Sequence, residues 1–240
     1  MKLKGKNVLI TGAAVRLGAV MARSVAAEGG NVLIHYNGSR AEAEALQAEL
    51  QQEGANAHLL QADLSDLQQA GQLIERASQH GPLFALVNSA SVFEDINLRT
   101  TELADWQRHL DINLTAPFLL SQAFWKAAGK QPGRIINLLD WRALRPGTDH
   151  LPYTISKVGL AGLTRSLAAA IAPNITVNGI ALGAILPPSD GRQPSGILDN
   201  VPAGRWAELD ELAQTLIFLL SGPAYITGEI IHLDGGRHLV

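Results

Sequence analysis

Short apolar runs alternate with longer amphipathic stretches along most of this chain. Runs rich in Val, Ile and Leu, bounded by turn residues, predict seven β-strands at residues 7–11, 31–36, 57–61, 84–88, 134–139, 175–180 and 229–233. The stretches between them predict helices at about residues 16–28, 39–52, 66–79, 103–110, 116–128, 153–171 and 209–220. Strands that are apolar throughout are typical of a parallel sheet covered on both faces. The pattern therefore predicts an α/β fold, a doubly wound parallel sheet of seven strands in a three-layer αβα sandwich.

The pattern contains no repeat and no interdomain linker. A chain of 240 residues suits one hydrophobic core, so residues 1–240 are expected to form a single domain. The longest irregular segment, residues 186–206, is rich in Pro and Gly. A stretch of this length without regular structure is usually a functional loop, and we expect it to contact the substrate.

Composition and charge narrow the possible partners. The net charge is −3, from 19 basic and 22 acidic residues, which gives no indication of a nucleic-acid partner. The chain has no cysteine, which excludes disulfides, thiolate zinc sites and cysteine nucleophiles, and no metal site is expected. No apolar run is long enough for a signal sequence or a bilayer span. We therefore expect a cytoplasmic protein with a small-molecule substrate and no membrane partner.

The first predicted strand leads into a glycine-containing turn, Thr11-Gly12-Ala13-Ala14-Val15-Arg16-Leu17-Gly18. Gly12 permits a tight turn, and Gly18 allows the next helix to pack closely on the strand. Backbone N–H groups at the start of such a helix bind phosphate. The turn therefore predicts a nucleotide phosphate site, with an ordinary strand-to-helix turn as the alternative.

A second candidate site lies in the middle of the chain. Tyr153 and Lys157 are four residues apart, so they share one helix face. A nearby ammonium favours the phenolate, which would let the tyrosine exchange a proton near neutral pH. Asp140 ends the buried strand just upstream. With the glycine turn, these residues indicate a nicotinamide-dependent reductase.

Together these residues resemble the short-chain dehydrogenase/reductase family over essentially the whole chain, and within it the pteridine reductases and related dihydromonapterin/dihydrofolate reductases. Two features of that subgroup are Arg16 in place of a middle glycine and Asp140 in place of the usual Ser. The resemblance also rests on three further stretches: His35-Tyr36 followed by Ser39, Asn88-Ser89-Ala90-Ser91-Val92-Phe93, and Leu233-Asp234-Gly235-Gly236-Arg237-His238-Leu239. It implies a Rossmann-like fold and a homotetramer.

The end of the second predicted strand favours NADP(H) over NAD(H). NAD enzymes tend to carry an acid there, whereas this chain has no acid before Glu42. Arg16 and Ser39 suit a 2′-phosphate, although Ser39 could also be a helix N-cap. Asp63 could contact the adenine or cap the next helix. The cofactor site that the resemblance implies comprises Gly12, Arg16, Leu17, Gly18, His35, Tyr36, Asn37, Ser39, Asp63, Leu64, Asn88, Ala90, Ser91, Tyr153, Lys157, Gly183 and Ile185.

The resemblance implies NADPH-dependent reduction of an oxidised pterin. Tyr153 would donate a proton, and the Asp140 carboxyl would relay or supply the proton that a pterin ring nitrogen takes up. Lys157 would lower the pKa of Tyr153 and hold the nicotinamide ribose, while Asn113 would support a water-linked proton path. The implied catalytic residues are Asp140, Tyr153, Lys157 and Asn113, and the implied substrate-binding residues are Arg16, Ser91, Phe93, Asp140 and Tyr153.

Three of these residues also have structural interpretations. Phe93 would sandwich the pterin against the nicotinamide, but a lone Phe after a strand is more often part of the core. Asn113 could bend or cap a helix. Asp140 could simply cap Trp141-Arg142 or pair with a nearby Arg.

The chain departs from the family pattern at Leu182, where Pro is usual, and at Ser89. His150 stands where some pteridine reductases have a substrate-side Tyr. One alternative is therefore an NADPH-dependent carbonyl reductase, acting for example on a 3-oxoacyl thioester, although Asp140 and Phe93 argue against it. The other is a cofactor-binding sensor without catalysis. Such proteins commonly lose the Tyr or the Lys, and this chain has both.

Overall fold

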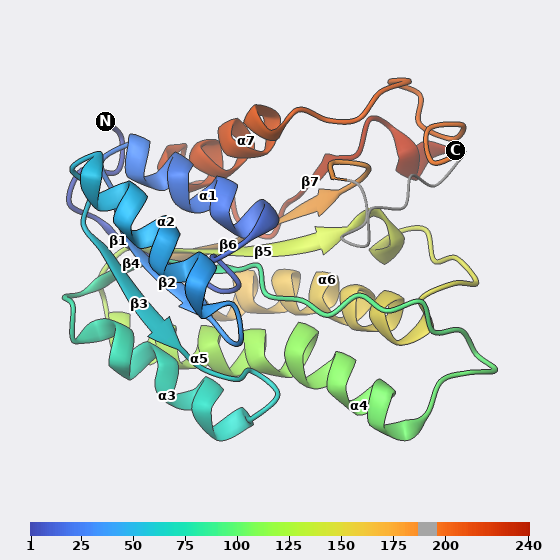
Figure 1. The fold of residues 1–240 in the computed structure, drawn as a ribbon, viewed down its shortest axis with the longest axis horizontal. Helices are drawn as coiled ribbons and strands as arrows, with labels where there is room; N and C mark the ends of the chain where they lie inside the picture. The colour runs from blue at the N-terminus through green and yellow to red at the C-terminus, as the bar shows by residue number, and fades with distance from the viewer. Residues whose placement is uncertain (187–195) are drawn as a thin grey trace.

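A central sheet with helices on both faces forms the molecule (Figure 1). The computed structural model describes residues 1–186 and 196–240, so residues 187–195 of the predicted loop at 186–206 lie outside the described residues. The sheet has seven parallel strands in the order β3-β2-β1-β4-β5-β6-β7. The strands are β1 (Asn7–Ile10), β2 (Asn31–Tyr36), β3 (Ala57–Gln61), β4 (Leu83–Asn88), β5 (Gly133–Asp140), β6 (Ile175–Leu182) and β7 (Ile230–Leu233). This confirms the predicted three-layer α/β fold.

The helices divide between the two faces of the sheet (Figure 1). They are α1 (Arg16–Ala27), α2 (Arg40–Gln52), α3 (Leu67–Ser78), α4 (Leu103–Leu110), α5 (Ala116–Ala128), α6 (Leu151–Ile171) and α7 (Leu209–Ser221). α1, α2 and α7 cover one face, and α3 to α6 lie on the other. Within the described residues, no helix is both long and apolar enough to cross a membrane.

The strands are apolar throughout because both of their faces are buried. In β1, Val8 and Ile10 pack in the core under α1 and α7, whereas Leu9 packs in the core under α3 and α5. Successive side chains of a strand point to opposite faces, so such a strand needs an apolar residue at every position. The second core includes Phe124, which is fully buried.

The strand order determines where a ligand can bind. β1 pairs with β2 on one side and with β4 on the other, so the chain changes direction across the sheet between β1 and β4. The loops after these strands separate, and they leave a crevice beyond their carboxyl ends. This is the end of the sheet at which the glycine turn and Asp140 lie.

Two local features differ from the sequence-based expectation. α6 begins at Leu151 rather than at residue 153, because Pro152 is accommodated in its first turn. A π-helical turn, Asp111–Thr115, joins α4 directly to α5. A π-turn has the same composition as the helix around it, so the apolar pattern does not reveal it.

Candidate active site

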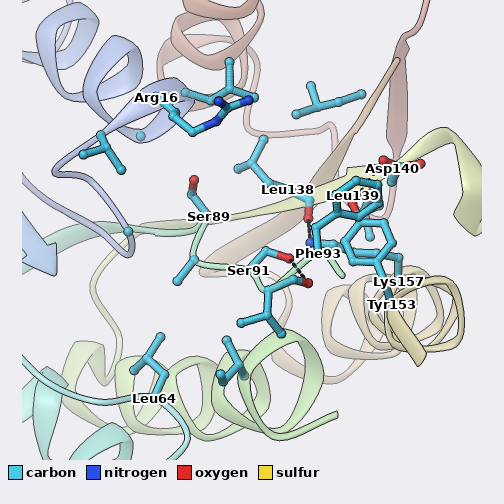
Figure 2. Close-up of a pocket in the computed structure, with 18 of the residues that line it drawn as sticks. Arg16, Leu64, Ser89, Ser91, Phe93, Leu138, Leu139, Asp140, Tyr153 and Lys157 are labelled. Carbon is cyan, nitrogen blue, oxygen red and sulfur yellow. Dashed lines mark hydrogen bonds between the residues drawn. The ribbon is translucent and has the colours of Figure 1, made fainter. Parts of the chain in front are cut away.

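A cavity of about 460 Å³ opens beyond the carboxyl ends of β1, β4, β5 and β6. Figure 2 shows the candidate catalytic side chains on one side of it, with Arg16 and Leu64 well away from them. The predicted site residues that line the cavity are Gly12, Arg16, Leu17, Gly18, His35, Asn37, Asp63, Leu64, Ala90, Ser91, Phe93, Asp140, Tyr153, Lys157, Gly183 and Ile185. The described residues contain no group of three or more His, Asp or Glu side chains that could hold a metal.

Three residues assigned to the cofactor from sequence do not line the cavity. Tyr36 is buried and packs in the core under α1 and α7. Ser39 is the N-cap residue of α2, although its side chain makes no capping hydrogen bond. Asn88 is buried, and its Nδ2 donates to Oδ1 of Asn137 at 2.8 Å. Tyr36 and Asn88 each precede a cavity-lining residue, and Ser39 lies two residues beyond Asn37, so their contact with the cofactor stays a prediction.

The glycine turn has the geometry that its sequence predicts. Gly12 has a φ of +64°, and a Cβ there would lie 2.9 Å from the Cα of Ala90. A Cβ on Gly18 would lie 2.0 Å from the carbonyl oxygen of Gly12. Both positions therefore require glycine, the first for the turn and the second for the approach of α1. The N-cap of α1 is Val15, whose side chain accepts no hydrogen bond, so the first-turn N–H groups suit a phosphate.

His35 connects the turn to the sheet. Its Nδ1 accepts from the backbone N–H of Gly12 at 3.0 Å, so Nε2 carries the proton and donates to the carbonyl oxygen of Ala62 at 3.2 Å. Burial lowers the pKa of His35 to about 4, which keeps the ring neutral. Because the backbone occupies both ring nitrogens, His35 supports the shape of the turn and can offer the cofactor only its ring surface.

Asp63 lines the cavity but does not cap a helix. Its Oδ1 accepts from the N–H and the hydroxyl of Ser65, at 2.9 and 2.7 Å. The N-cap of α3 is Asp66, which accepts from Gln68 and Gln69. The capping interpretation of Asp63 is therefore wrong, and contact with a ligand remains its predicted role.

Asp140 and Tyr153 form a hydrogen-bonded pair at one end of the cavity. The Tyr153 hydroxyl donates to Oδ2 of Asp140 at 3.0 Å. Oδ1 of Asp140 accepts from the backbone N–H of Arg142 at 2.8 Å and caps the short helical turn Trp141–Ala143. The capping interpretation of Asp140 is therefore correct for Oδ1, while Oδ2 is held by Tyr153 and the site role of Asp140 stays a prediction.

Lys157 binds the backbone of β5 rather than the Tyr153 hydroxyl. Its Nζ donates to the carbonyl oxygen of Leu138 at 2.8 Å and lies 5.6 Å from the centroid of the Tyr153 ring. Burial lowers the pKa of Lys157 to about 8, against the opposing effect of the Asp140 charge.

The expectation that Tyr153 has a lowered pKa is wrong for this structure. Burial, followed by the charge and hydrogen bond of Asp140, raises the pKa of Tyr153 well above its ordinary value, and only Arg142 opposes this. The physical reason is position: a carboxylate touches the hydroxyl, whereas the Lys157 ammonium is directed to a backbone carbonyl.

Phe93 lies at the edge of the cavity rather than in the core. Its side chain is 52% exposed, so the core interpretation is wrong. The ring stacks on His150 with centroids 4.0 Å apart and planes 20° apart, and it meets Tyr153 edge-on at 4.6 Å. An exposed aromatic ring beside the Tyr153 hydroxyl suits a flat heteroaromatic ligand.

Asn113 lies behind the cavity, in the π-helical turn. Its Oδ1 accepts from the Ser91 hydroxyl at 3.1 Å and from the Val92 N–H at 2.9 Å. Its Nδ2 donates to the Val92 carbonyl and to the Ser156 hydroxyl, both at 3.0 Å. Asn113 therefore ties the segment that carries Ser91 and Phe93 to α6, and its place in the π-turn fits the helix-bending interpretation.

The segment after β6 forms the cavity wall beside Asp140, which pairs with Leu182 in the sheet. A Cβ on Gly183 would lie 2.6 Å from the Cα of Asp234, so the approach of these two segments requires glycine. Leu182, at the position where the family usually has Pro, lines the cavity together with the buried Ile185. Gly12, Gly18 and Gly183 therefore let the backbone segments around the cavity approach their neighbours more closely than a side chain would allow.

Sequence reasoning missed Arg142 and Asp149 as site residues. Arg142 approaches Oδ1 of Asp140 at 3.8 Å and forms an ion pair with Asp149 at 2.8 Å. The only signal in the sequence was the possibility that Asp140 pairs with a nearby Arg. Nothing in the pattern distinguishes Arg142 from Arg145, which is exposed.

Known proteins resemble this chain over its full length. A family model described as enoyl-(acyl carrier protein) reductase matches residues 12–238. The 3-oxoacyl-[acyl-carrier-protein] reductase of Escherichia coli is 34% identical, with 100% of each chain covered, and that of Synechocystis sp. is 33% identical over 98% of this chain and 97% of that protein.

Solved structures also match this chain over nearly its full length. The FolM alternative dihydrofolate reductase 1 from Brucella canis, complexed with NADP, is 36% identical, has a TM-score of 0.93, and is matched over 100% of this chain and 96% of its own. A short chain dehydrogenase from Burkholderia cenocepacia in complex with NADP is 31% identical, with a TM-score of 0.93 and 99% of each chain covered. With the matched family model and these full-length relatives, the chain belongs to the short-chain dehydrogenase/reductase family of nicotinamide-dependent oxidoreductases.

Proposed function

We propose that this protein uses NADPH to reduce an oxidised pterin, of the dihydropterin or dihydrofolate type. The observation that carries the proposal is the pairing of Asp140 with Tyr153 beneath the exposed ring of Phe93. A ketone reductase needs one proton donor and a neutral hydroxyl, whereas reduction of a pterin C=N bond needs a proton at a ring nitrogen. A carboxyl group can bind that nitrogen edge and relay the proton.

The cavity fits a dinucleotide cofactor. Gly12, Gly18 and Gly183 provide close backbone approach, and the start of α1 suits a diphosphate. No carboxylate follows β2 at residues 37–39, so nothing there repels a 2′-phosphate, and Arg16 lines the same region. The NADP complexes of the Brucella canis and Burkholderia cenocepacia proteins support the same cofactor.

Within this proposal, the residues of the chain bind the substrate and move protons. NADPH, when bound, supplies the hydride. The Tyr153 hydroxyl donates the proton, and the Asp140 carboxylate that accepts its hydrogen bond can relay a replacement. Lys157 is buried next to this pair, and its Nζ lies 5.6 Å from the centroid of the Tyr153 ring. Phe93 and Ser91 form the wall against which the pterin would stack.

The second candidate is reduction of a ketone such as a 3-oxoacyl thioester. It is favoured by the 3-oxoacyl-[acyl-carrier-protein] reductases, which are 33–34% identical to this chain over nearly its full length. The FolM protein from Brucella canis is 36% identical, so overall identity does not separate the two substrate classes. Asp140 and Phe93 separate them on chemical grounds.

The test is oxidation of NADPH measured against a panel of oxidised pterins, folates and ketones, with wild type and Asp140→Ser side by side. We expect the wild type to reduce a pterin best. Asp140→Ser should lose pterin reduction steeply, by about 10²–10⁴ in rate, the usual loss with a proton-transfer group. Its ketone reduction should hold or rise. Unchanged pterin turnover in the variant would make Asp140 a bystander and favour the ketone reductase.

A further inference from the structure

Arg142 contacts Asp140, the carboxylate that accepts the hydrogen bond of the Tyr153 hydroxyl. Its backbone N–H binds Oδ1 of Asp140 at 2.8 Å, and its Nη1 lies 3.8 Å from the same oxygen. This leaves Oδ2 for the Tyr153 hydroxyl. The side chains of Arg142 and Asp140 are only 14% and 15% exposed, so solvent screens this contact weakly.

The other end of the guanidinium contacts the substrate side of the site. Nη2 of Arg142 donates to Oδ2 of Asp149 at 2.8 Å, and the same oxygen lies 3.6 Å from Nε2 of His150. The His150 ring stacks on Phe93, and the Arg142 guanidinium itself lies 5.7 Å from the centroid of the Phe93 ring. The Arg142 side chain thus contacts both Asp140, which would relay the proton, and Phe93, whose ring would face the substrate.

The backbone of His150 has a conformation that its neighbours, including the Arg142–Asp149 ion pair, must stabilise. His150 has a φ of +50°, a left-handed conformation that is uncommon for a residue other than glycine. Its Nδ1 lies 2.7 Å from the Glu94 carbonyl oxygen, which holds the ring against the segment that carries Phe93. A strained backbone persists only where its surroundings fix it, and the Arg142–Asp149 ion pair is one of the contacts that do so.

Arg142 is also suited to remain charged in this position. Burial disfavours the cation, but the hydrogen bond that Arg142 donates to Asp149 and the charges of Asp140 and Asp149 outweigh it, and the pKa of Arg142 is raised. A planar guanidinium can address two carboxylates at once, which an ammonium cannot do from one position.

We propose that Arg142 is a positioning residue, which holds Asp140 against Tyr153 and, through Asp149, holds His150 against Phe93. This role rests on the proposed function, since it is defined by the proton donor and the substrate ring. The two interactions of Arg142 differ in burial. The contact with Asp140 is buried, whereas the Asp149 side chain is 47% exposed, so solvent weakens the ion pair with Asp149.

Three variants and a matched control test this role. Arg142→Gln removes the charge, and Arg142→Lys keeps the charge without the planar guanidinium. Asp149→Asn weakens only the ion pair on the substrate side. Arg145→Gln removes an exposed arginine three residues away and serves as the control. Each is assayed with whichever substrate of the panel the wild type reduces fastest. Melting temperature, NADPH affinity and calorimetric affinity for that substrate are measured alongside.

We expect Arg142→Gln to lower kcat by about ten- to a hundredfold, the loss typical of a catalytic group displaced by about 1 Å, with NADPH affinity and Tm like those of the control. Arg142→Lys should recover part of kcat. Asp149→Asn should weaken substrate binding a few-fold and largely keep kcat. The kcat losses of Arg142→Gln and Asp140→Ser should not multiply in the double variant, because one residue acts through the other.

Wild-type kcat in Arg142→Gln would overturn the proposal. So would equal losses in kcat, affinity and Tm across the Arg142 and Asp149 variants, because such losses would show a merely structural role. A wild type that reduces ketones but no pterin would overturn the proposed substrate instead. The positioning role of Arg142 would then still be tested by the kcat of its variants with the ketone.

Discussion

The hydroxyl of Tyr153 is held by a carboxylate and kept protonated by its surroundings. A proton donor must still have its proton when the substrate arrives, and the raised pKa of Tyr153 ensures that. Asp140 thereby has two effects on the tyrosine: it keeps the proton on the hydroxyl before the reaction and can supply the path by which it is replaced.

Tyr153→Phe should abolish turnover and leave NADPH binding nearly intact. The variant removes only the transferable proton, and loss of a general acid typically costs about 10²–10⁴ in rate. Steady-state kinetics and a fluorescence titration with NADPH measure the two quantities separately. Full activity in the variant would show that another group donates the proton.

Among the elements, the turn between β1 and α1 depends on β2 through His35. The neutral ring accepts the Gly12 N–H at 3.0 Å, and a protonated ring could not accept it. The folded-state pKa of about 4 lies below the ordinary value of 6.5, so between these two pH values the unfolded chain takes up a proton that the folded chain does not. Folding stability must therefore fall as the pH falls through this range, and above it His35 adds no pH dependence.

Acidification from pH 6.5 to 4 should cost the wild type roughly 3 kcal/mol of unfolding free energy through His35 alone, because each unit of pKa shift is worth about 1.4 kcal/mol. Urea unfolding at several pH values gives the measurement. His35→Gln cannot titrate, so its curve should be flatter by about this amount even though the variant is less stable at neutral pH. Parallel curves for the two proteins would exclude His35 as the source.

The same turn and the end of β2 should select NADPH over NADH. One charge-assisted contact to a phosphate is worth about 1.5–3 kcal/mol, so we expect the Kd for NADPH to be about ten- to a hundredfold lower. Titration of the wild type with both cofactors measures this. Arg16→Gln should reduce the preference, because Arg16 lines this part of the cavity. Equal affinities in the wild type would contradict an NADP site.

The sequence predicts elements better than contacts, for a physical reason. β2 and α5 have the predicted bounds, because a strand buried on both faces or a helix with a packed face leaves an unmistakable apolar pattern. The glycines of the turn were also predictable, since a tight turn needs Gly12 and the close approach of the helix needs Gly18. The protonation of Tyr153 and the position of Arg142 were not, because they depend on which side chains the fold brings within about 3 Å.

At the scale of the whole molecule, we expect a homotetramer. Phe118 and Trp125 on α5 and Ile155 and Val158 on α6 remain partly exposed, on the same side of the sheet. Exposed apolar side chains on neighbouring helices are typical of an interface between identical subunits.

Light scattering should give a molar mass about four times the 25.6 kDa of one chain. Trp125→Glu together with Val158→Glu should reduce it, because burying two carboxylates in an apolar interface is costly. Leu67→Glu on α3, which also replaces a partly exposed apolar residue, provides the control. A mass of 25.6 kDa for the wild type would contradict the tetramer.

The division of the two Asp140 oxygens between Arg142 and Tyr153 also constrains how such a site changes over evolution. A serine at this position offers one short hydroxyl, so in Asp140→Ser the Arg142 N–H and the Tyr153 hydroxyl would have to share one oxygen in place of two. It also leaves the Arg142 guanidinium with Asp149 as its one close carboxylate. The effect of an exchange at 140 therefore depends on the residue at 142. Asp140→Ser alone should therefore shift the protein from pterin towards ketone reduction, and a second substitution at 142 should change how far that shift goes.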